Sequence, residues 1–187
     1  HSTLKSLTTG SNNTAVGSQA MENVTQVTNT VAVGYLALND GITPYSTVAV
    51  GAEALRYSTL SSGTVAVGAG AGRLDATNAT VTRADNCVFI GATTKPLGNN
   101  ESNQIVIGSN AVGLGSNTAV LGSTVITKTR LHGNVAIGTD TPASSLDVAN
   151  GDVEVSQIAS GIILKSPDGT RYRVTVANGG TLTVAAV

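Results

Sequence analysis

A five-residue motif recurs along this chain at a fixed interval, and its spacing constrains the fold more than any other feature. The motif reads Thr-Val-Ala-Val-Gly at residues 30–34, 47–51 and 64–68, and a variant, Asn-Thr-Ala-Val-Gly, occupies residues 13–17. The closing glycines at positions 17, 34, 51 and 68 are each 17 residues apart. A short fixed period is typical of stacked repeats, in which each repeat packs only against its neighbours.

Four further copies of the motif follow at less regular intervals. They end at Gly91, Gly108, Gly122 and Gly138, so the successive intervals are 23, 17, 14 and 16 residues. The eight copies together cover residues 13–138. We expect the 23-residue interval to hold an additional loop within residues 73–86.

Each copy is a short apolar run that predicts a β-strand. Side chains alternate between the two faces of a strand, so Val31 and Val33 share one face and Ala32 lies on the other. Neither face carries a charge, which predicts a strand buried on both sides, as in a covered parallel sheet. The β-branched residues favour an extended strand, and the glycine that follows can adopt a positive φ and turn the chain sharply.

A second apolar pair follows several of these glycines, and polar, turn-rich residues then return the chain. The pairs are Ala20-Met21, Ala37-Leu38, Ala54-Leu55 and Ala111-Val112. We expect each pair to form a second short strand, which completes one coil of a parallel β-solenoid. We also expect the central alanine of each motif to face outwards, where identical chains around a symmetry axis would cover the apolar strip.

The first four copies resemble the head repeat of YadA-type trimeric autotransporter adhesins, which reads roughly Asn-Ser/Thr-Val-Ala-Ile/Val-Gly-x-x-Ala. Most copies in this chain are longer than the repeat of that family. The resemblance implies an all-β fold, a left-handed parallel β-roll in a homotrimer, followed here by a small antiparallel β meander. Similar repeats occur in bacteriophage tail fibres and spikes.

Two further stretches resemble segments of phage fibres. Residues 134–148, with the sequence NVAIGTDTPASSLDV, resemble a linker ahead of a C-terminal module, and residues 166–176 resemble a C-terminal segment of phage structural proteins. The resemblance implies a structural or adhesive module of a tail fibre, spike or similar appendage of a virion. Its partners would be other virion or appendage proteins and, for host attachment, a glycan of the host cell surface.

Three other hypotheses remain open on the sequence. The chain could be the head of a trimeric adhesin on a bacterial cell surface, or a virion decoration or collar protein without a receptor role. The fourth hypothesis is ice binding, because Thr30, Thr47 and Thr64 form a one-residue-wide threonine ladder.

The pattern along the chain divides it into four segments. They are a polar N-terminal segment at 1–12, the β-roll at 13–138, a linker at 139–151 and a C-terminal antiparallel β module at 152–187. The polar, β-branched run at 124–130 is a place where the chain can leave the roll.

The C-terminal module shows alternating segments separated by turn signals. We expect a three-stranded meander from 161–165, 170–177 and 181–187, joined by turns at 167–169 and 178–180. Residues 152–155 also alternate and predict a further strand. In a trimer, three meanders could pack together and cap the open end of the roll.

Composition argues against several classes of function. The formal net charge is −1 and the basic residues form no stripe, so nucleic-acid binding is not expected. No apolar run approaches the roughly 20 residues of a membrane-spanning helix, so membrane insertion is not expected either. The chain begins at His1 rather than Met, which indicates a fragment or a processed product. A single Cys87 excludes an intrachain disulfide and is predicted to be a small buried residue.

The sequence shows no catalytic constellation, so we predict no enzyme activity, no cofactor and no metal. His132 is interpreted as a surface residue, and a metal site on a threefold axis is the alternative. Asp152 and Glu154 have the spacing of a glycosidase pair, but on a small sheet we expect them to face water.

The candidate receptor-binding residues are aromatic side chains near the return loops and one neighbouring cation. They are Tyr35, Tyr45, Arg56 and Tyr57.

Overall fold

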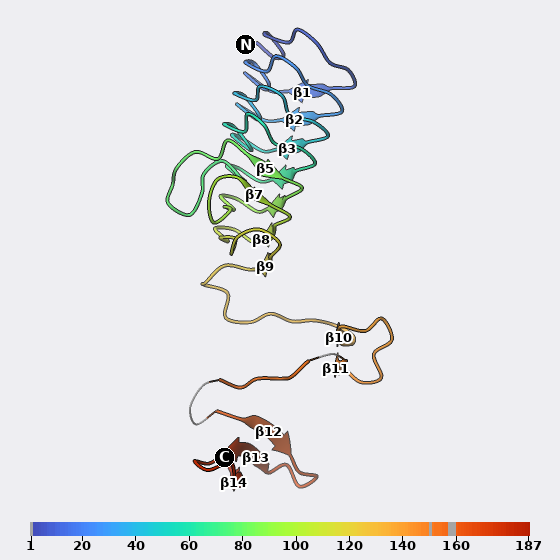
Figure 1. The fold of residues 1–187 in the computed structure, drawn as a ribbon, viewed down its shortest axis with the longest axis vertical. Helices are drawn as coiled ribbons and strands as arrows, with labels where there is room; N and C mark the ends of the chain where they lie inside the picture. The colour runs from blue at the N-terminus through green and yellow to red at the C-terminus, as the bar shows by residue number, and fades with distance from the viewer. Residues whose placement is uncertain (1, 150, 157–159) are drawn as a thin grey trace. The chain divides into compact units, whose positions relative to one another are not determined.

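The computed structural model describes residues 2–149, 151–156 and 160–187, which divide into two compact units at residues 128 and 129 (Figure 1). The described part of both units is all-β. The boundary falls inside the run at 124–130 that was expected to leave the roll. Predictions that concern His1, Asn150 and residues 157–159 lie outside the described residues.

The first unit is the predicted parallel β-solenoid, with one motif strand in each coil. Seven strands pair side by side in a single parallel sheet, visible as a ladder in Figure 1. They are β1 (Thr14–Val16), β2 (Val31–Val33), β3 (Val48–Val50), β4 (Val65–Val67), β6 (Val88–Ile90), β8 (Ile105–Ile107) and β9 (Ala119–Leu121). The register stacks identical positions, with Ala32 opposite Ala49 and Ala49 opposite Ala66.

The long interval between β4 and β6 holds an additional loop, as its length predicted. Leu74 and Thr80 form an antiparallel bridge at its neck. The Asp75 carboxylate accepts hydrogen bonds from the Thr77 hydroxyl and from the backbone N–H groups of Thr77 and Ala79, and these bonds, the hydroxyl first, lower the pKa of Asp75. The loop is therefore an organised turn that projects from the coils (Figure 1).

A second ladder begins after this loop. Strands β5 (Ala84–Asp85) and β7 (Glu101–Ser102) pair in parallel on the return side of their coils. Cys87 is buried next to β5, as predicted.

The prediction that the central alanine faces outwards was wrong. Ala32, Ala49 and Ala66 are fully buried inside their own coils, whereas the valines on either side of each point outwards and are partly exposed. The interior must also hold the buried threonine ahead of each strand and the apolar pair of the opposite wall. Little space remains for the central side chain, so alanine fits there and valine lies outside.

The second apolar pair is buried as expected in the first three cases, whereas Val112 of the fourth pair is 39% exposed, and no pair forms a strand. Met21, Leu38 and Leu55 lie in turns, with left-handed φ angles of 51°, 50° and 50°. Their N–H groups still donate to carbonyls of the next coil, at 3.1 Å for Met21 and 2.9 Å for Leu38. The pair is therefore a hydrogen-bonded corner of the coil.

One coil packs differently because Phe89 takes the slot that alanine occupies in the coils before it. Phe89 is fully buried and is the largest of the buried side chains. Gly72 stands where Leu38 and Leu55 stand in earlier coils, and a Cβ at Gly72 would lie 2.9 Å from Phe89 Cδ2. The missing side chain at Gly72 leaves the space that the phenyl ring fills.

Close stacking also explains the glycine that ends the first six motifs. At Gly51 the φ angle is +131°, and a Cβ would lie 2.5 Å from the carbonyl oxygen of the equivalent glycine in the next coil. Only a residue without a side chain permits both this backbone conformation and this approach.

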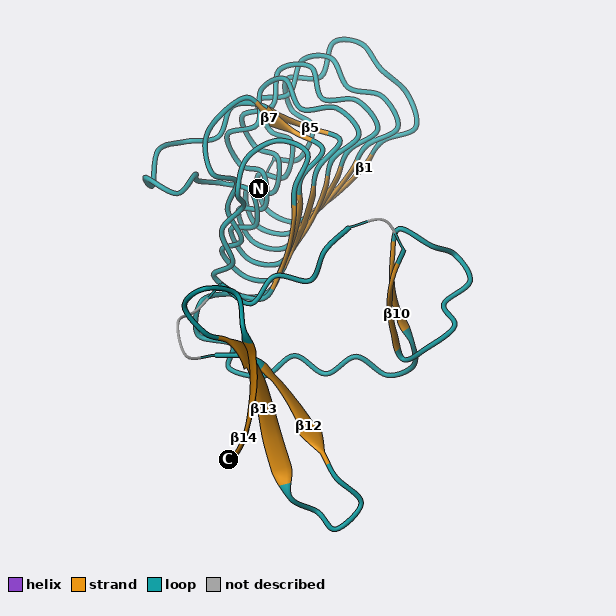
Figure 2. Cartoon of the chain, turned by 60° about the horizontal axis from the view of Figure 1, so that its bottom comes forward, coloured by secondary structure: helices purple, strands orange, loops and turns teal. Residues whose placement is uncertain are grey.

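The described residues of the second unit form two small sheets. The eighth motif copy forms β10 (Val135–Ile137), but it pairs with β11 (Leu146–Val148) and does not extend the seven-stranded sheet. The predicted antiparallel meander is present as β12 (Ile162–Lys165), β13 (Arg171–Val176) and β14 (Leu182–Ala186), shown in Figure 2. Residues 152–155 form no strand, in contrast to the prediction.

Candidate functional site

The outer face of the seven-stranded sheet is a continuous apolar ladder. Two outward side chains from each strand stack on their equivalents in the next coil, and most of them are valine or isoleucine. Exposure is greatest at the two ends, with 54% of Val16 and 63% of Leu121 exposed. Six strand spacings make the ladder about 29 Å long. An apolar strip of this length is typical of an interaction surface.

The antiparallel sheet of the second unit also has one apolar face. Cross-strand pairs Ile162–Val174 and Leu164–Tyr172 lie on the same side as Val174–Val184 and Val176–Leu182. The opposite face carries Lys165, Arg171, Arg173, Thr175 and Thr183, together with Ile163 and Ala185. A hollow of about 530 Å³ borders the apolar face, with Val153 and Val155 on its rim.

This apolar face has no core beneath it. Among the described residues of 129–187, none is buried, and Leu182 and Val184 are 69% and 65% exposed. The side chains that would normally form the interior of a small sheet are therefore open to solvent.

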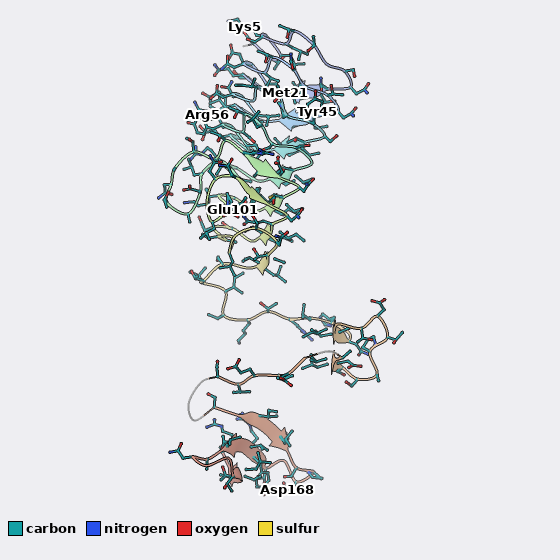
Figure 3. The ribbon with its side chains drawn as sticks, viewed as in Figure 1. Lys5, Met21, Tyr45, Arg56, Glu101 and Asp168 are labelled. Atoms are coloured by element: carbon teal, nitrogen blue, oxygen red, sulfur yellow. The ribbon has the colours of Figure 1, made fainter. Side chains whose placement is uncertain are left out.

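The predicted receptor-binding residues fall into two places. Arg56 and Tyr57 lie together, with the guanidinium carbon 5.0 Å from the centre of the tyrosine ring, and Arg56 Nη1 is 3.1 Å from Glu53 Oε1. Tyr45, half exposed, forms parallel bridges with the return segments of neighbouring coils and lies apart from Arg56, near the strands (Figure 3). Tyr35 is also half exposed and borders a hollow that includes Glu53.

The sequence prediction missed three charged residues: Glu53 and Arg73 in the same hollow as Tyr35, and Lys95 in the adjoining hollow. Glu53 binds Arg73 as well as Arg56, and Lys95 donates to Asn78 Oδ1. The 17-residue period contains the signal that could have found one of them, because Arg56 and Arg73 are one period apart and occupy equivalent positions in adjacent coils.

No protein family, curated protein or solved structure matches this chain. Within the described residues, no three His, Cys, Asp or Glu side chains gather where they could hold a metal ion. No helix in the same residues has the length and apolar character needed to cross a membrane. His132, Asp152 and Glu154 are exposed. Burial raises the pKa of the Cys87 thiol, with smaller contributions from the charges of Asp85 and Glu101.

Proposed function

We propose that this protein is a homotrimeric, rigid β-roll module of a virion appendage such as a tail fibre or spike, with a structural and adhesive role. The observation that carries the proposal is the uncovered apolar face of the antiparallel sheet. A three-stranded sheet needs a packed apolar face to be stable, and no described residue of 129–187 is buried.

An identical chain is the partner that best fits both apolar surfaces. The ladder of the first unit and the sheet of the second belong to the same chain, so association of identical chains supplies cover for both at once. Closed cyclic symmetry buries such faces without leaving an open end. The choice of three chains and of a left-handed roll follows the resemblance of the motif copies to trimeric adhesin heads.

The repeat structure supports a mechanical role. Each coil is bonded to the next through the strand ladder and through the corner and return turns, so bending would break hydrogen bonds on more than one side. A rigid trimer would present three identical contact sites at fixed positions, and weak individual binding would gain avidity.

The oligomeric state tests the proposal directly. Light scattering of the purified chain is expected to give three times the 18.6 kDa mass of one chain. Val184→Asp places a charge on the apolar face and is expected to yield monomers or unfolded protein. Thr183→Asp, the adjacent residue on the polar face, serves as the matched control and should leave the mass unchanged. A well-folded monomeric wild type would refute the trimer.

The location of the protein tests the assignment to a virion. Cryo-electron microscopy of the native particle is expected to show this module in a tail appendage. Its detection on a bacterial surface, with none in purified particles, would support the adhesin hypothesis instead.

A further inference from the structure

Three shallow hollows follow one another along one corner of the coils. The first, about 390 Å³, ends at Tyr35, and the second, about 330 Å³, begins there. The third, about 210 Å³, shares Gly70, Arg73 and Thr93 with the second. The second and third hollows form one depression, here called the corner groove, lined by Tyr35, Glu53, Gly70, Arg73, Thr93 and Lys95.

The residue after the motif glycine is small in the two coils that follow Tyr35 along the corner groove. Tyr35 holds this position after β2, but Ala52 and Ala69 hold it after β3 and β4. The groove therefore has an aromatic wall at one end and an unobstructed floor beyond it. A half-exposed tyrosine offers a flat apolar face with a polar tip, which suits the face of a sugar ring.

The other end of the corner groove is cationic. Arg73 and Lys95 line the third hollow together with the amides of Asn78 and Asn110, and no carboxylate lines it. Glu53, in the second hollow, pairs with both Arg56 and Arg73, so the two guanidinium groups together keep one positive charge in excess of its carboxylate. An anionic group would therefore meet a guanidinium, an ammonium and amide donors at this end.

Asp75, in the projecting loop, is an acidic group close enough to Lys95 for the lysine charge to contribute to its lowered pKa. Its carboxylate is mostly buried and already accepts three hydrogen bonds within that loop. Lys95 Nζ donates to Asn78 Oδ1, and its own side chain remains on the wall of the hollow. Lys95 is therefore placed to bind a ligand as well as the loop.

The two ends of the groove are too far apart for a single sugar. Tyr35 follows β2 and Lys95 follows β6, so three strand spacings separate their coils, about 14 Å along the stack. A ligand that contacts both ends must be a linear oligomer with a flat ring at one end and a negative charge at the other.

We infer that the corner groove binds a linear acidic oligosaccharide, with a sugar ring on Tyr35 and a uronic-acid carboxylate between Arg73 and Lys95. This inference rests on the proposed adhesive function, because it names the site and the class of ligand. Arg56 lies across the coils from Tyr45 (Figure 3), so the Glu53 wall of the groove is away from the strand side that the proposed trimer would cover.

Calorimetric titration with an oligogalacturonate tests the inference on the assembled 187-residue chain. The matched probe is the same oligomer with its carboxyl groups methyl-esterified, which keeps the rings and removes the charge. Lys95→Met is expected to weaken binding of the acidic oligomer about tenfold, the loss of one charge-assisted contact. Tyr35→Ala is expected to weaken binding of both forms, and Lys128→Met is the control for loss of an exposed lysine elsewhere.

The outcomes separate this inference from the proposed function. Trimeric protein that binds neither form, or binds the ester equally well, overturns the groove assignment and leaves the trimeric rod intact. Equal binding of a sulfated oligosaccharide overturns the assignment to a carboxylate. Monomeric wild-type protein, measured by light scattering, refutes the proposed function whether or not it binds sugar.

Discussion

Replacing Gly72 and Phe89, separately and together, tests whether successive coils are packed by mutual fit. A Cβ at Gly72 would lie 2.7 Å from Leu55 Cδ2 and 2.9 Å from Phe89 Cδ2, and the φ angle at Gly72 is +66°. Gly72→Ala should therefore destabilise the protein by about 2 kcal/mol, about half from the left-handed backbone and about half from overpacking.

The second change, Phe89→Val, removes most of a fully buried ring. It should destabilise the protein by about 2 kcal/mol, less than the 3–5 kcal/mol typical of truncation to alanine. Additive effects would give about 4 kcal/mol for the double variant. Because the added methyl group at Gly72 enters space that the ring vacates, we expect a total of only about 2.5 kcal/mol and hence an interaction energy of about 1.5 kcal/mol.

Urea unfolding at one fixed protein concentration measures these differences, since association changes the apparent stability. Gly70→Ala is the matched control. Its φ angle is +65°, but the nearest atom to a Cβ there is 3.6 Å away, so only the backbone contribution of about 1 kcal/mol is expected. A double variant whose effect equals the sum of the single effects within about 0.5 kcal/mol would refute the packing argument.

Three shorter predictions concern single positions in the first unit. Gly51→Ala should destabilise the protein by about 3 kcal/mol in the same urea assay, because strain and backbone overlap add; an effect no larger than that of Gly70→Ala would contradict this. Gln104→Met should raise the free energy of unfolding by about 1 kcal/mol, because no described residue hydrogen-bonds the buried amide of Gln104; a lower urea midpoint would contradict it. The Cys87 thiol, buried and with a raised pKa, should react with a maleimide only after unfolding, and rapid labelling of the native protein would show that its coil opens.

The strand ladder was predictable from the sequence because the spacing of the motif glycines determines the register of the strands. Equal intervals place each of the first four motifs opposite the next, and parallel pairing follows. The direction in which the motif faces could not be read in the same way. Both faces of a Val-Ala-Val strand are apolar, so the alternation of side chains does not indicate which face points into the coil. The width of the coil determines that the alanine face points inwards.

The prediction of a second strand at the corner of each coil was wrong for a different reason. Leucine and methionine disfavour a left-handed backbone, so local preference argued against turns at Met21, Leu38 and Leu55. Hydrogen bonds from these residues to the next coil, together with burial of their side chains, offset that preference. The hydrogen bonds and the burial both depend on neighbouring repeats, so the sequence of a single repeat does not predict them.

The groove was only partly predictable. Of its lining residues, Tyr35 was named from residue type and position near a return loop, and Arg56, also named, only pairs with the lining residue Glu53. Lys95 follows the 23-residue interval in the chain, and its link to Asn78 depends on how the additional loop in that interval folds back. That loop geometry is set by the hydrogen bonds of Asp75, which no periodicity encodes.

The two apolar surfaces differ in how well they specify a partner. The ladder repeats the same valine pair on β2, β3 and β4 and similar apolar side chains on β6 and β8, so a neighbouring chain could shift by one coil, about 4.8 Å, and lose little contact. The antiparallel sheet has no such translational repeat, because its apolar face combines isoleucine, leucine, tyrosine and valine at unique positions. In an assembly of identical chains, the ladder would therefore supply most of the length of the interface between chains. The C-terminal sheet would fix the register of one chain against the next.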